Sequence, residues 1–264
     1  MSDVLTPGSL SFFPVAGLPE VLPGDDLIAI LDRAFGGTSN PQLRDGDVIV
    51  VAQKIVSKAE NRYVDLASVE PSTAALELAQ RCQKDPRLVE LVLRESTEVL
   101  RVAPNVLIVR HRLGFVVANA AIDQSNLPHD DVHGERALLL PVNPDAAAQS
   151  LREGLEQRYG LKLAVLISDS FGRAWRMGVC GVCVGCSGLN PLVDLRGTPD
   201  RSGRLLQVTQ IAVADQLCAT ATLVCGEGAE GQPIVIVRGV PAAYFISGHG
   251  ASELVRPLAQ DLFR

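Results

Sequence analysis

The sequence lacks long apolar runs, clustered positive charge and an apolar leader. No run reaches the roughly 18 apolar residues that a membrane-spanning helix needs, and the amino terminus, MSDVLTPGSL, contains neither a basic nor an apolar segment. Lysine and arginine number 24 against 30 aspartates and glutamates, a formal net charge of −6, with the two signs interspersed. Surfaces that bind nucleic acid are clustered and basic. We therefore expect a cytoplasmic protein that binds neither membranes nor nucleic acid.

Cysteine is sparse apart from one cluster. Of six cysteines, three form C-x2-C-x2-C at Cys180, Cys183 and Cys186, a spacing that also occurs in iron–sulfur clusters and in half of a zinc site. The spacers are glycine and valine, and no fourth thiol lies at the usual cluster spacing. We therefore expect packed, structural cysteines, with a metal site as the alternative.

Apolar residues are plentiful. The chain has 264 residues, of which 47% are hydrophobic, so we expect one domain over residues 1–264, or two intimately packed subdomains. Short apolar runs predict strands at 10–15, 48–52, 106–110, 115–118, 163–167 and 233–237. Amphipathic or long apolar stretches predict helices at 27–35, 73–83, 85–99, 146–159 and 205–224, and residues 194–204 are expected to form a long loop or flap.

The stretch 163–188 is the expected centre of the protein. Its apolar start predicts a buried strand that stops at Ser168, which places Asp169 and Ser170 at the strand's carboxyl end. A carboxylate and a hydroxyl are hard oxygen ligands that suit Mg²⁺ or Mn²⁺. The alternative is that these two residues cap a short helix.

Two arginines follow this strand. Arg173 and Arg176 come within two turns of Asp169 and are candidates for contacts with phosphate or carboxylate oxygens. The alternative is that both are solvated.

Polar groups follow two other apolar runs. Lys54 and Lys58 come directly after the strand expected at 48–52 and are candidates for contacts with triphosphate oxygens, although exposed lysines are the commoner outcome. Asp123 and Asn126 follow the expected hairpin and are candidates for contacts with a cation and a ligand. A simple turn is the alternative for that segment.

A glycine-rich loop occupies residues 225–232. Its three glycines allow the backbone to approach a ligand closely, and Glu227 is a third candidate metal ligand. The loop is not a Walker loop, because it leaves an expected helix, enters an expected strand and lacks the lysine. A glycine helix cap followed by a turn is the alternative.

One more polar cluster contains His129, Asp130, Asp131 and His133. Its surroundings predict an exposed loop, and we prefer that interpretation to metal binding.

Taken together, five stretches resemble one enzyme family. They are FPVAGLPEV with PGDDL, GDVIVVAQKIVSKAE, NAAIDQSN, LISDSFGRAWRMGVCGVCVGCSG and LVCGEGAEGQPIVIVRG, in this order from about residue 12 to 240. The chain thereby resembles the coenzyme F420-0:L-glutamate ligases, γ-glutamyl ligases that elongate the deazaflavin cofactor F420. The match is to the stand-alone form, without a fused nitroreductase-like domain.

The resemblance implies a fold and an activity. The implied fold is α+β, with mixed and antiparallel sheets and flanking helices, in an intertwined homodimer. The implied enzyme is a GDP-forming ligase that joins L-glutamate to the carboxylate of F420-0 in coenzyme F420 biosynthesis. GTP would be the co-substrate, and two Mn²⁺ or Mg²⁺ ions would bind per site, with K⁺ as a further candidate. In such ligases the γ-phosphoryl group passes to the carboxylate, and the glutamate amine attacks the acyl phosphate.

The resemblance also implies residue roles. The metal ligands would be Asp123, Asp169, Ser170 and Glu227, and the catalytic residues would be Asp123, Asp169, Glu227 and Lys58. The nucleotide contacts would be Leu18, Pro19, Glu20, Val21, Gln53, Lys54, Lys58, Asn126, Cys225, Gly226, Glu227, Gly228, Ala229, Glu230, Gly231 and Gln232. Arg173 and Arg176 would hold substrate carboxylates.

The chain departs from the family pattern at three places. Ser170 stands where threonine is usual, Ala121 where a glycine commonly precedes Ile-Asp, and Gln53-Lys54 where a smaller hydroxyl pair is found. The alternative function is a nucleotide- and metal-binding module of the same fold without ligase activity.

Overall fold

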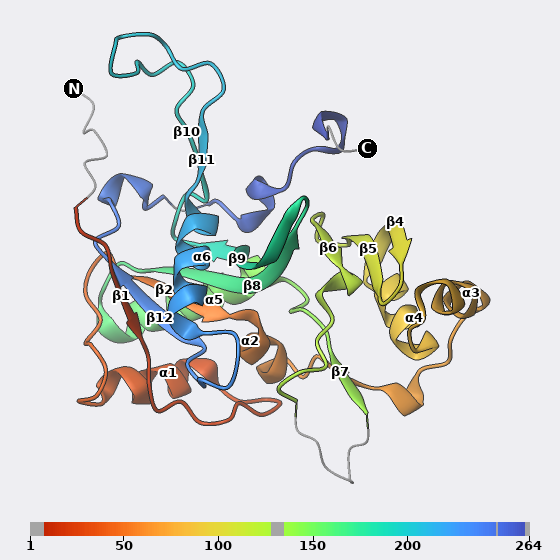
Figure 1. The fold of residues 1–264 in the computed structure, drawn as a ribbon. Helices are drawn as coiled ribbons and strands as arrows, with labels where there is room; N and C mark the ends of the chain where they lie inside the picture. The colour runs from red at the N-terminus through yellow and green to blue at the C-terminus, as the bar shows by residue number, and fades with distance from the viewer. Residues whose placement is uncertain (1–7, 128–134, 247, 262–264) are drawn as a thin grey trace.

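The main sheet is mixed. The computed structural model describes residues 8–127, 135–246 and 248–261. Within them this sheet has five strands in the order β1-β12-β2-β8-β9 (Figure 1). Their bounds are Ser11–Pro14 for β1, Ile234–Arg238 for β12, Val48–Ala52 for β2, Ala164–Arg173 for β8 and Arg176–Ser187 for β9. Strands β2 and β8 run parallel, and the other neighbouring pairs run antiparallel.

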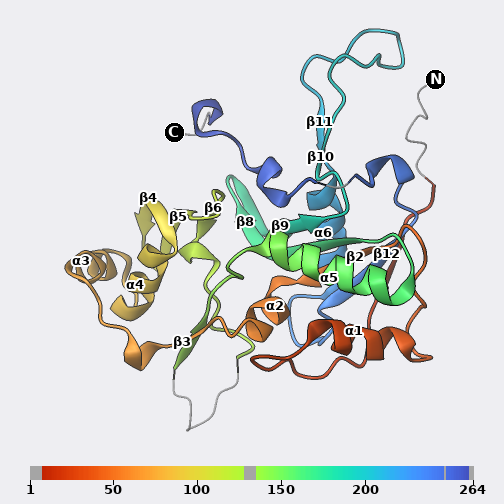
Figure 2. The same ribbon diagram turned by 180° about the vertical axis from the view of Figure 1, so that it is seen from behind.

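Helices cover both faces of this sheet. Helices α1 (Leu27–Gly36) and α5 (Pro144–Tyr159) lie on one face, and α6 (Val213–Cys225) lies on the other (Figures 1 and 2). Alternate residues of β2 enter the two cores, with Ile49 and Val51 on the α1 side and Val48 and Val50 on the α6 side. A strand covered on both faces has no solvated side, which explains the uninterrupted apolar run.

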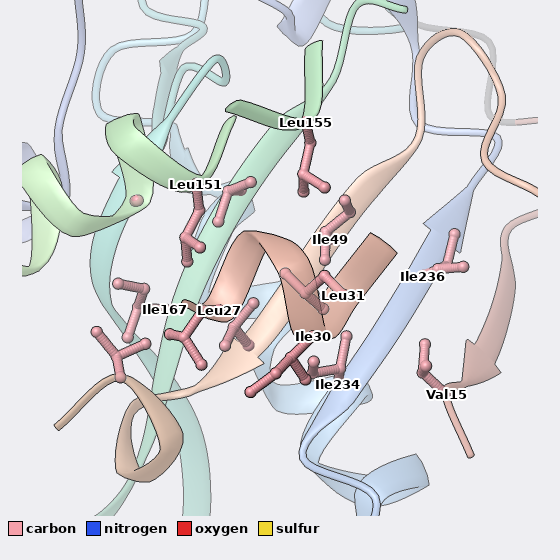
Figure 3. Packing of buried hydrophobic residues seen from close by; sticks show 14 of the residues in the cluster. Val15, Leu27, Ile30, Leu31, Ile49, Leu151, Leu155, Ile167, Ile234 and Ile236 are labelled. Carbon is pink, nitrogen blue, oxygen red and sulfur yellow. The ribbon is translucent and has the colours of Figure 1, made fainter. Parts of the chain in front are cut away.

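The α1 core shows how local sequence and packing agree. The Asp26 carboxylate accepts hydrogen bonds from the backbone N–H groups of Ile28 and Ala29, at 2.9 and 3.2 Å, and so caps the helix. Leu27, Ile30 and Leu31 of α1 then pack against sheet residues such as Ile49 and Ile234, as Figure 3 shows. Helix α5 closes the same core with Leu151 and Leu155, and Gly160 ends it in the left-handed conformation, with φ at 66°.

Two glycines let helices touch the edge strand β9. A Cβ at Gly181 would lie 2.5 Å from the Cys218 carbonyl oxygen of α6, and a Cβ at Gly185 would lie 2.5 Å from the Pro144 carbonyl oxygen of α5. Between them, Cys183 is buried in the core on the α6 side. The glycines and small residues of this segment therefore serve close packing of helices on a strand.

A second group of elements lies beside the main sheet. It contains α3 (Thr73–Cys82), α4 (Pro86–Arg94) and a sheet of β4 (Ser96–Ala103), β5 (Val106–His111) and β6 (Val116–Ala118). These elements enclose a core of their own. The antiparallel pair β3 (Tyr63–Asp65) and β7 (Arg136–Leu138) lies where the chain passes to and from this group (Figures 1 and 2).

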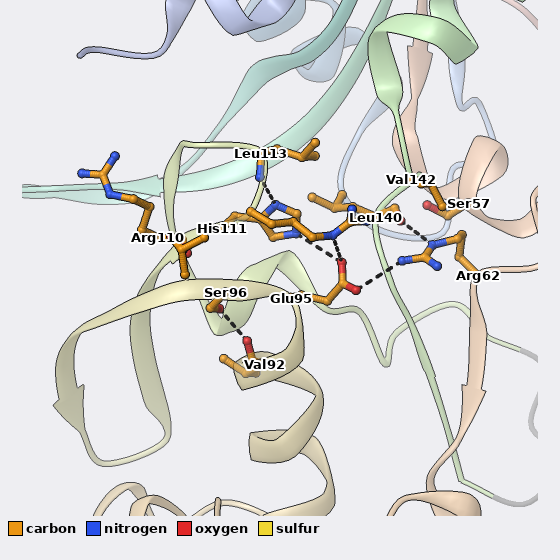
Figure 4. A network of polar contacts seen from close by, with 12 residues as sticks. Ser57, Arg62, Val92, Glu95, Ser96, Arg110, His111, Leu113, Leu140 and Val142 are labelled. Atoms are coloured by element: carbon orange, nitrogen blue, oxygen red, sulfur yellow. Dashed lines mark hydrogen bonds and ion pairs between the residues drawn. The ribbon is translucent and has the colours of Figure 1, made fainter. Parts of the chain in front are cut away.

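A polar network ties the second group to the main body (Figure 4). Glu95, just after α4, accepts hydrogen bonds from Arg112 Nε at 2.8 Å and from Arg62 Nη2 at 3.4 Å, and the buried His111 Nε2 lies 3.6 Å away. Burial opposes ionisation of Glu95, but these three partners outweigh it and hold its pKa at about 2. Arg62 also donates to the Leu140 carbonyl at 2.8 Å. The carboxylate therefore links three separate chain segments at neutral pH.

Five short 3₁₀ turns and one α-helix complete the helical elements of the described residues. Helix α2 spans Gln53–Ala59. The 3₁₀ turns are η1 (Leu66–Ser68), η2 (Asn119–Ala121), η3 (Ala242–Tyr244), η4 (Ala251–Leu254) and η5 (Leu258–Gln260). Turn η2 comes just before Asp123 in the chain. None of the helices formed by the described residues combines the length and apolarity needed to cross a membrane.

Three expected elements differ from the structure. The strand predicted to stop at Ser168 runs on to Arg173, because β9 pairs with it along that whole length. The helix expected at 85–99 ends at Arg94, and the following residues pair with β5 as β4. Residues 210–212 form β11 (Gln210–Ala212), paired with β10 (Leu192–Asp194), so α6 begins only at Val213.

The expected loop at 194–204 belongs to an extended arm. The arm, residues 192–212, consists of β10, a long connection and β11, and it projects away from the body (Figures 1 and 2).

Candidate functional site

A cavity of about 580 Å³ opens at one end of the main sheet. It collects every residue that the sequence predicted for nucleotide or metal binding. These are Leu18, Pro19, Glu20, Val21, Gln53, Lys54, Lys58, Asp123, Asn126, Asp169, Ser170, Cys225, Gly226, Glu227, Gly228, Ala229, Glu230, Gly231 and Gln232. Residues that are far apart in the chain are thus brought to one place.

Strand direction explains this convergence. Because β2 and β8 are parallel neighbours, with Ala52 opposite Ser168, the start of α2 lies beside Asp169. Strand β12 runs antiparallel to β2, so the loop that leads into β12 reaches the same end of the sheet. Ligand sites of sheets with parallel strands commonly lie at such carboxyl ends.

Three acidic side chains meet in this cavity. The Asp123 backbone forms an isolated bridge with Leu138, and its Oδ2 accepts a hydrogen bond from Gln53 Nε2 at 2.9 Å. Asp169 Oδ1 accepts from the Ser170 backbone N–H at 2.8 Å. The Ser170 hydroxyl donates to Glu227 Oε1 at 2.7 Å. The acids thus come from a turn, a strand and a loop, and each is held by a hydrogen bond.

The backbone before Asp123 is strained. Asn119, Ala120 and Ala121 have φ values of 51°, 53° and 53°, in the left-handed region that costs an L-residue roughly 1–2 kcal/mol. Ala121 stands where the family pattern has glycine, which adopts this conformation without that cost. Strain beside a candidate ligand is a common feature of functional sites.

The acids are difficult to ionise together. Burial, followed by the nearby Asp123 charge, raises the pKa of the Asp169 carboxyl to about 7. Burial also raises the pKa of Asp123, against the lowering effects of Lys54 and Gln53. A divalent cation would stabilise the charged forms of both groups.

The donor set fits Mg²⁺ or Mn²⁺ in its chemistry. Asp123, Asp169, Ser170 and Glu227 offer hard oxygens, the ligands that these ions prefer. Within residues 8–127, 135–246 and 248–261, no three His, Cys, Asp or Glu side chains already surround a common metal position. Magnesium sites of phosphate-transfer enzymes use one or two carboxylates and complete their coordination with substrate phosphates and water. The cavity matches that kind of site rather than an all-protein cage.

Two lysines bring positive charge to the same cavity. Lys58 is only 5% exposed, and its ammonium forms an ion pair with Glu20. Lys54 Nζ lies 3.4 Å from Asp123 Oδ2 and donates to the Ser125 carbonyl and hydroxyl oxygens, both at 3.3 Å. Both lysines line the cavity that also contains the three acids, so the cavity offers cationic groups to the phosphates of a ligand.

The glycine-rich loop folds on itself. Gly226 and Gly231 have φ values of 78° and 66°. The Glu230 carboxylate accepts from the Gly228 backbone N–H at 2.8 Å and lies where a Cβ at Gly226 would be, 2.3 Å from its carboxyl carbon. The backbone angle therefore favours glycine at position 226, and a Cβ there would displace the Glu230 carboxylate.

Comparisons with known proteins show the family of this chain. The family model described as F420-0:Gamma-glutamyl ligase matches residues 17–239. The chain belongs to this family. The coenzyme F420:L-glutamate ligase of Methanothermobacter thermautotrophicus is 44% identical over 255 residues, which cover 97% of this chain and 99% of the relative. The proteins of the same name from Methanopyrus kandleri and Haloarcula marismortui are each 40% identical, with coverage of at least 96% on both sides.

In this member of the F420-0:γ-glutamyl ligase family, the two arginines predicted to hold substrate carboxylates do not line the cavity. Arg173 and Arg176 flank the turn between β8 and β9, and Arg173 Nη2 donates to the Met177 carbonyl at 3.3 Å. A strand advances about 3.3 Å per residue, so the unexpected continuation of β8 carries Arg173 well beyond Asp169. Their role in substrate binding stays a prediction.

Of the three clustered cysteines of this family member, two are buried and Cys180 is half-buried. Cys183 and Cys186 are buried, and their thiols donate to the Gly185 and Leu189 carbonyls. Contacts with Cys186 and Cys218, together with burial, raise the pKa of the Cys183 thiol. The positions expected to form a polar loop, His129, Asp130, Asp131 and His133, lie outside the described residues.

Sequence reasoning missed a residue that supports the site. Ser57 lies one helical turn after Gln53 on α2, and its hydroxyl donates to Gln53 Oε1 at 2.8 Å. The i, i+4 spacing of Gln53 and Ser57, which places their side chains on the same side of a helix, was the available signal.

Proposed function

We propose that this protein is a GTP- and divalent-metal-dependent ligase that joins L-glutamate to F420-0 through a γ-glutamyl amide, in the biosynthesis of coenzyme F420. One observation supports it most: three acids, two lysines and a glycine-rich loop line one cavity, in a chain that matches the F420-0:γ-glutamyl ligase family over residues 17–239. The relatives named coenzyme F420:L-glutamate ligase supply the substrate pair.

The nucleotide would occupy the cavity. Its volume of about 580 Å³ lies within the usual range for small-molecule sites, roughly 300–1,000 Å³. Lys58 and Lys54 would bind phosphate oxygens, and Glu20 would release the Lys58 ammonium as the phosphates arrive. The glycine-rich loop would bring backbone N–H groups close to the nucleotide.

Asp123, Asp169, Ser170 and Glu227 would hold two divalent ions. Such ions, when bound, neutralise the charge that develops during phosphoryl transfer. The protein's own part is to keep the four oxygen ligands in place, through the Leu138 bridge, the Gln53 amide and the bond between Ser170 and Glu227.

The reaction would pass through an acyl phosphate. The F420-0 carboxylate attacks the γ-phosphorus of GTP, GDP leaves, and the glutamate amine then displaces phosphate from the activated carboxyl group. No protein nucleophile is needed. Burial, with Glu227 and Cys218 nearby, raises the pKa of the cavity-lining Cys225 to about 11, so this thiol carries little of the reactive thiolate at neutral pH.

The proposal includes a homodimer. Trp175 and Met177, at the turn between β8 and β9, are 90% and 96% exposed, and Val208 in the arm is 84% exposed. Large apolar side chains that project into solvent support contact with another chain. The arm itself leaves the body of the protein as an extended ribbon (Figure 1).

A reconstituted reaction tests the proposed function. Purified protein with F420-0, GTP, Mn²⁺ and L-glutamate is expected to give a product heavier by one glutamyl residue or more, read by mass spectrometry. Omission of either the nucleotide or the metal should abolish product formation. ATP in place of GTP should give less product. Product formed without nucleotide or metal would contradict the proposal. GTP and Mn²⁺ binding without product would favour the alternative, an inactive binding module.

A further inference from the structure

Only one of the two carboxylate oxygens of Asp123 has side-chain partners among the described residues. Within the described part of the chain, both of its side-chain contacts fall on Oδ2: the Gln53 amide at 2.9 Å and the Lys54 ammonium at 3.4 Å. Its backbone is fixed separately, by the N–H and C=O bonds to Leu138 at 3.0 and 2.8 Å. Oδ1 is therefore the oxygen that this arrangement leaves for a metal ion.

The Gln53 amide uses both of its ends. Gln53 is 2% exposed, and while its Nε2 donates to Asp123, its Oε1 accepts from the Ser57 hydroxyl at 2.8 Å. Ser57 is fully buried. Both ends of the amide are thus engaged, and the second N–H of Nε2 is the group that remains for the nucleotide contact that the family resemblance implied.

The three residues form a hydrogen-bond chain with one direction. The two ends of a glutamine amide are nearly the same size, so its partners decide which end faces which neighbour. A carboxylate only accepts, so Nε2 must face Asp123, and Oε1 then needs a donor in a place that water does not reach. The Ser57 hydroxyl is that donor. Successive bonds of this kind polarise and strengthen one another in a buried site.

We propose that Ser57 is a positioning residue for the Asp123 carboxylate, acting through Gln53 to fix the oxygen that Asp123 offers to the divalent metal. The inference rests on the metal site of the proposed function. Without the Ser57 hydroxyl, Gln53 Oε1 is buried without a hydrogen-bond donor, and the interaction that fixes the orientation of the amide is lost. Rotation of the amide would place an oxygen against the carboxylate, which repels it, and Asp123 would lose its fixed position.

The test is Mn²⁺ binding by the full-length protein without nucleotide, followed by electron paramagnetic resonance of free Mn²⁺. Partners that orient a metal ligand typically change metal affinity 10–100-fold. Ser57→Ala and Gln53→Met are each expected to weaken Mn²⁺ binding by about 10–100-fold. Ser57→Thr, which keeps the hydroxyl, should bind within about threefold of the wild type, a change much smaller than that expected for loss of an orienting partner. Ligation by Ser57→Ala should fall at limiting Mn²⁺ and recover at saturating Mn²⁺, because the change acts on affinity.

A matched control separates positioning from general loss of stability. Ser187 is also buried, and its hydroxyl accepts from Arg152 Nε at 2.9 Å, outside the cavity. Ser187→Ala should lower the melting temperature as Ser57→Ala does, yet leave Mn²⁺ affinity unchanged. Wild-type Mn²⁺ affinity in both Ser57→Ala and Gln53→Met would overturn this inference but not the proposed function. Equal losses of Mn²⁺ affinity in Ser57→Ala, Ser57→Thr and Ser187→Ala would do the same. A wild-type protein that binds Mn²⁺ neither alone nor together with GDP would overturn the metal site of the proposed function as well.

Discussion

Asp169→Asn is expected to abolish ligation and, at the same time, to stabilise the metal-free protein at pH 8. Loss of one charged metal ligand should lower the rate at least about a hundredfold, by analogy with removal of other preorganised electrostatic groups. The gain in stability follows from the pKa of Asp169, which burial raises to about 7 in the folded protein, well above that of an exposed aspartate. Ionising this carboxyl in the folded state is costly, and asparagine does not ionise.

The pH dependence has a defined sign. Between about pH 4 and pH 7 the folded wild type holds a proton on Asp169 that the unfolded chain has released, so its stability falls as the pH rises. Asp169→Asn removes this loss. The free energy of unfolding of Asp169→Asn minus that of the wild type should therefore be near zero below pH 4. It should grow up to about pH 7 and stay level above that pH. Because the carboxyl is partly open to the cavity, we expect roughly 1–3 kcal/mol from urea unfolding with a chelator present.

Asp215→Asn is a matched control for this experiment. Asp215 on α6 is a half-buried carboxyl whose pKa is raised by burial, and it accepts from the Cys183 backbone N–H at 2.9 Å, outside the cavity. Its replacement should also stabilise the protein at high pH while leaving ligation intact. Near-wild-type ligation by Asp169→Asn at saturating Mn²⁺, or a stability difference that does not change with pH, would contradict the assigned role.

Lys58→Met is expected to raise the KM for GTP and to lower kcat/KM about ten- to a hundredfold. Methionine keeps most of the apolar stem of this buried side chain but removes the ammonium, and a lost charge-assisted hydrogen bond costs on the order of 1.5–3 kcal/mol. The fold should persist, because the partner left behind, Glu20, is 62% exposed and can be hydrated. Steady-state kinetics with varied GTP measures the effect.

Mn²⁺ affinity without nucleotide should change little in Lys58→Met, since Lys58 contacts Glu20 rather than the candidate ligands. Lys162→Met, at an exposed lysine, is the matched control and should behave as the wild type. An unchanged KM for GTP in Lys58→Met would show that this lysine does not bind the nucleotide.

Local sequence signals predicted the elements that depend on neighbours in the chain. The apolar run 48–52 gave β2 with the same bounds, and the helices predicted at 27–35 and 146–159 are α1, capped by Asp26, and α5, ended by Gly160. Each of these depends on burial or on a hydrogen bond within a few residues. The main misses depend on distant partners. Strand β8 continues past Ser168 because β9 pairs with it, and residues 96–103 and 210–212 become strands because β5 and β10 pair with them.

The candidate site likewise combines residues that local sequence indicates with an arrangement that depends on distant strand pairing. Polar residues after apolar runs indicated Lys58, Asp123, Asp169 and Glu227 one at a time, and the family resemblance joined them. Their meeting in one cavity follows from the parallel pairing of β2 with β8 and the antiparallel pairing of β12 with β2, which no single stretch of sequence specifies. The role of Ser57 required the orientation of the Gln53 side chain.

The most direct test of the proposed reaction follows one oxygen atom. F420-0 carrying ¹⁸O in its acceptor carboxylate is incubated with the protein, GTP, Mn²⁺ and L-glutamate, and the released phosphate is analysed by mass spectrometry. If the carboxylate attacks the γ-phosphorus and is then displaced by the amine, each released phosphate carries one carboxylate oxygen, so fully labelled F420-0 gives singly labelled phosphate. Phosphate without label, or a phosphorylated protein that accumulates when glutamate is withheld, would contradict an acyl phosphate formed directly on the substrate.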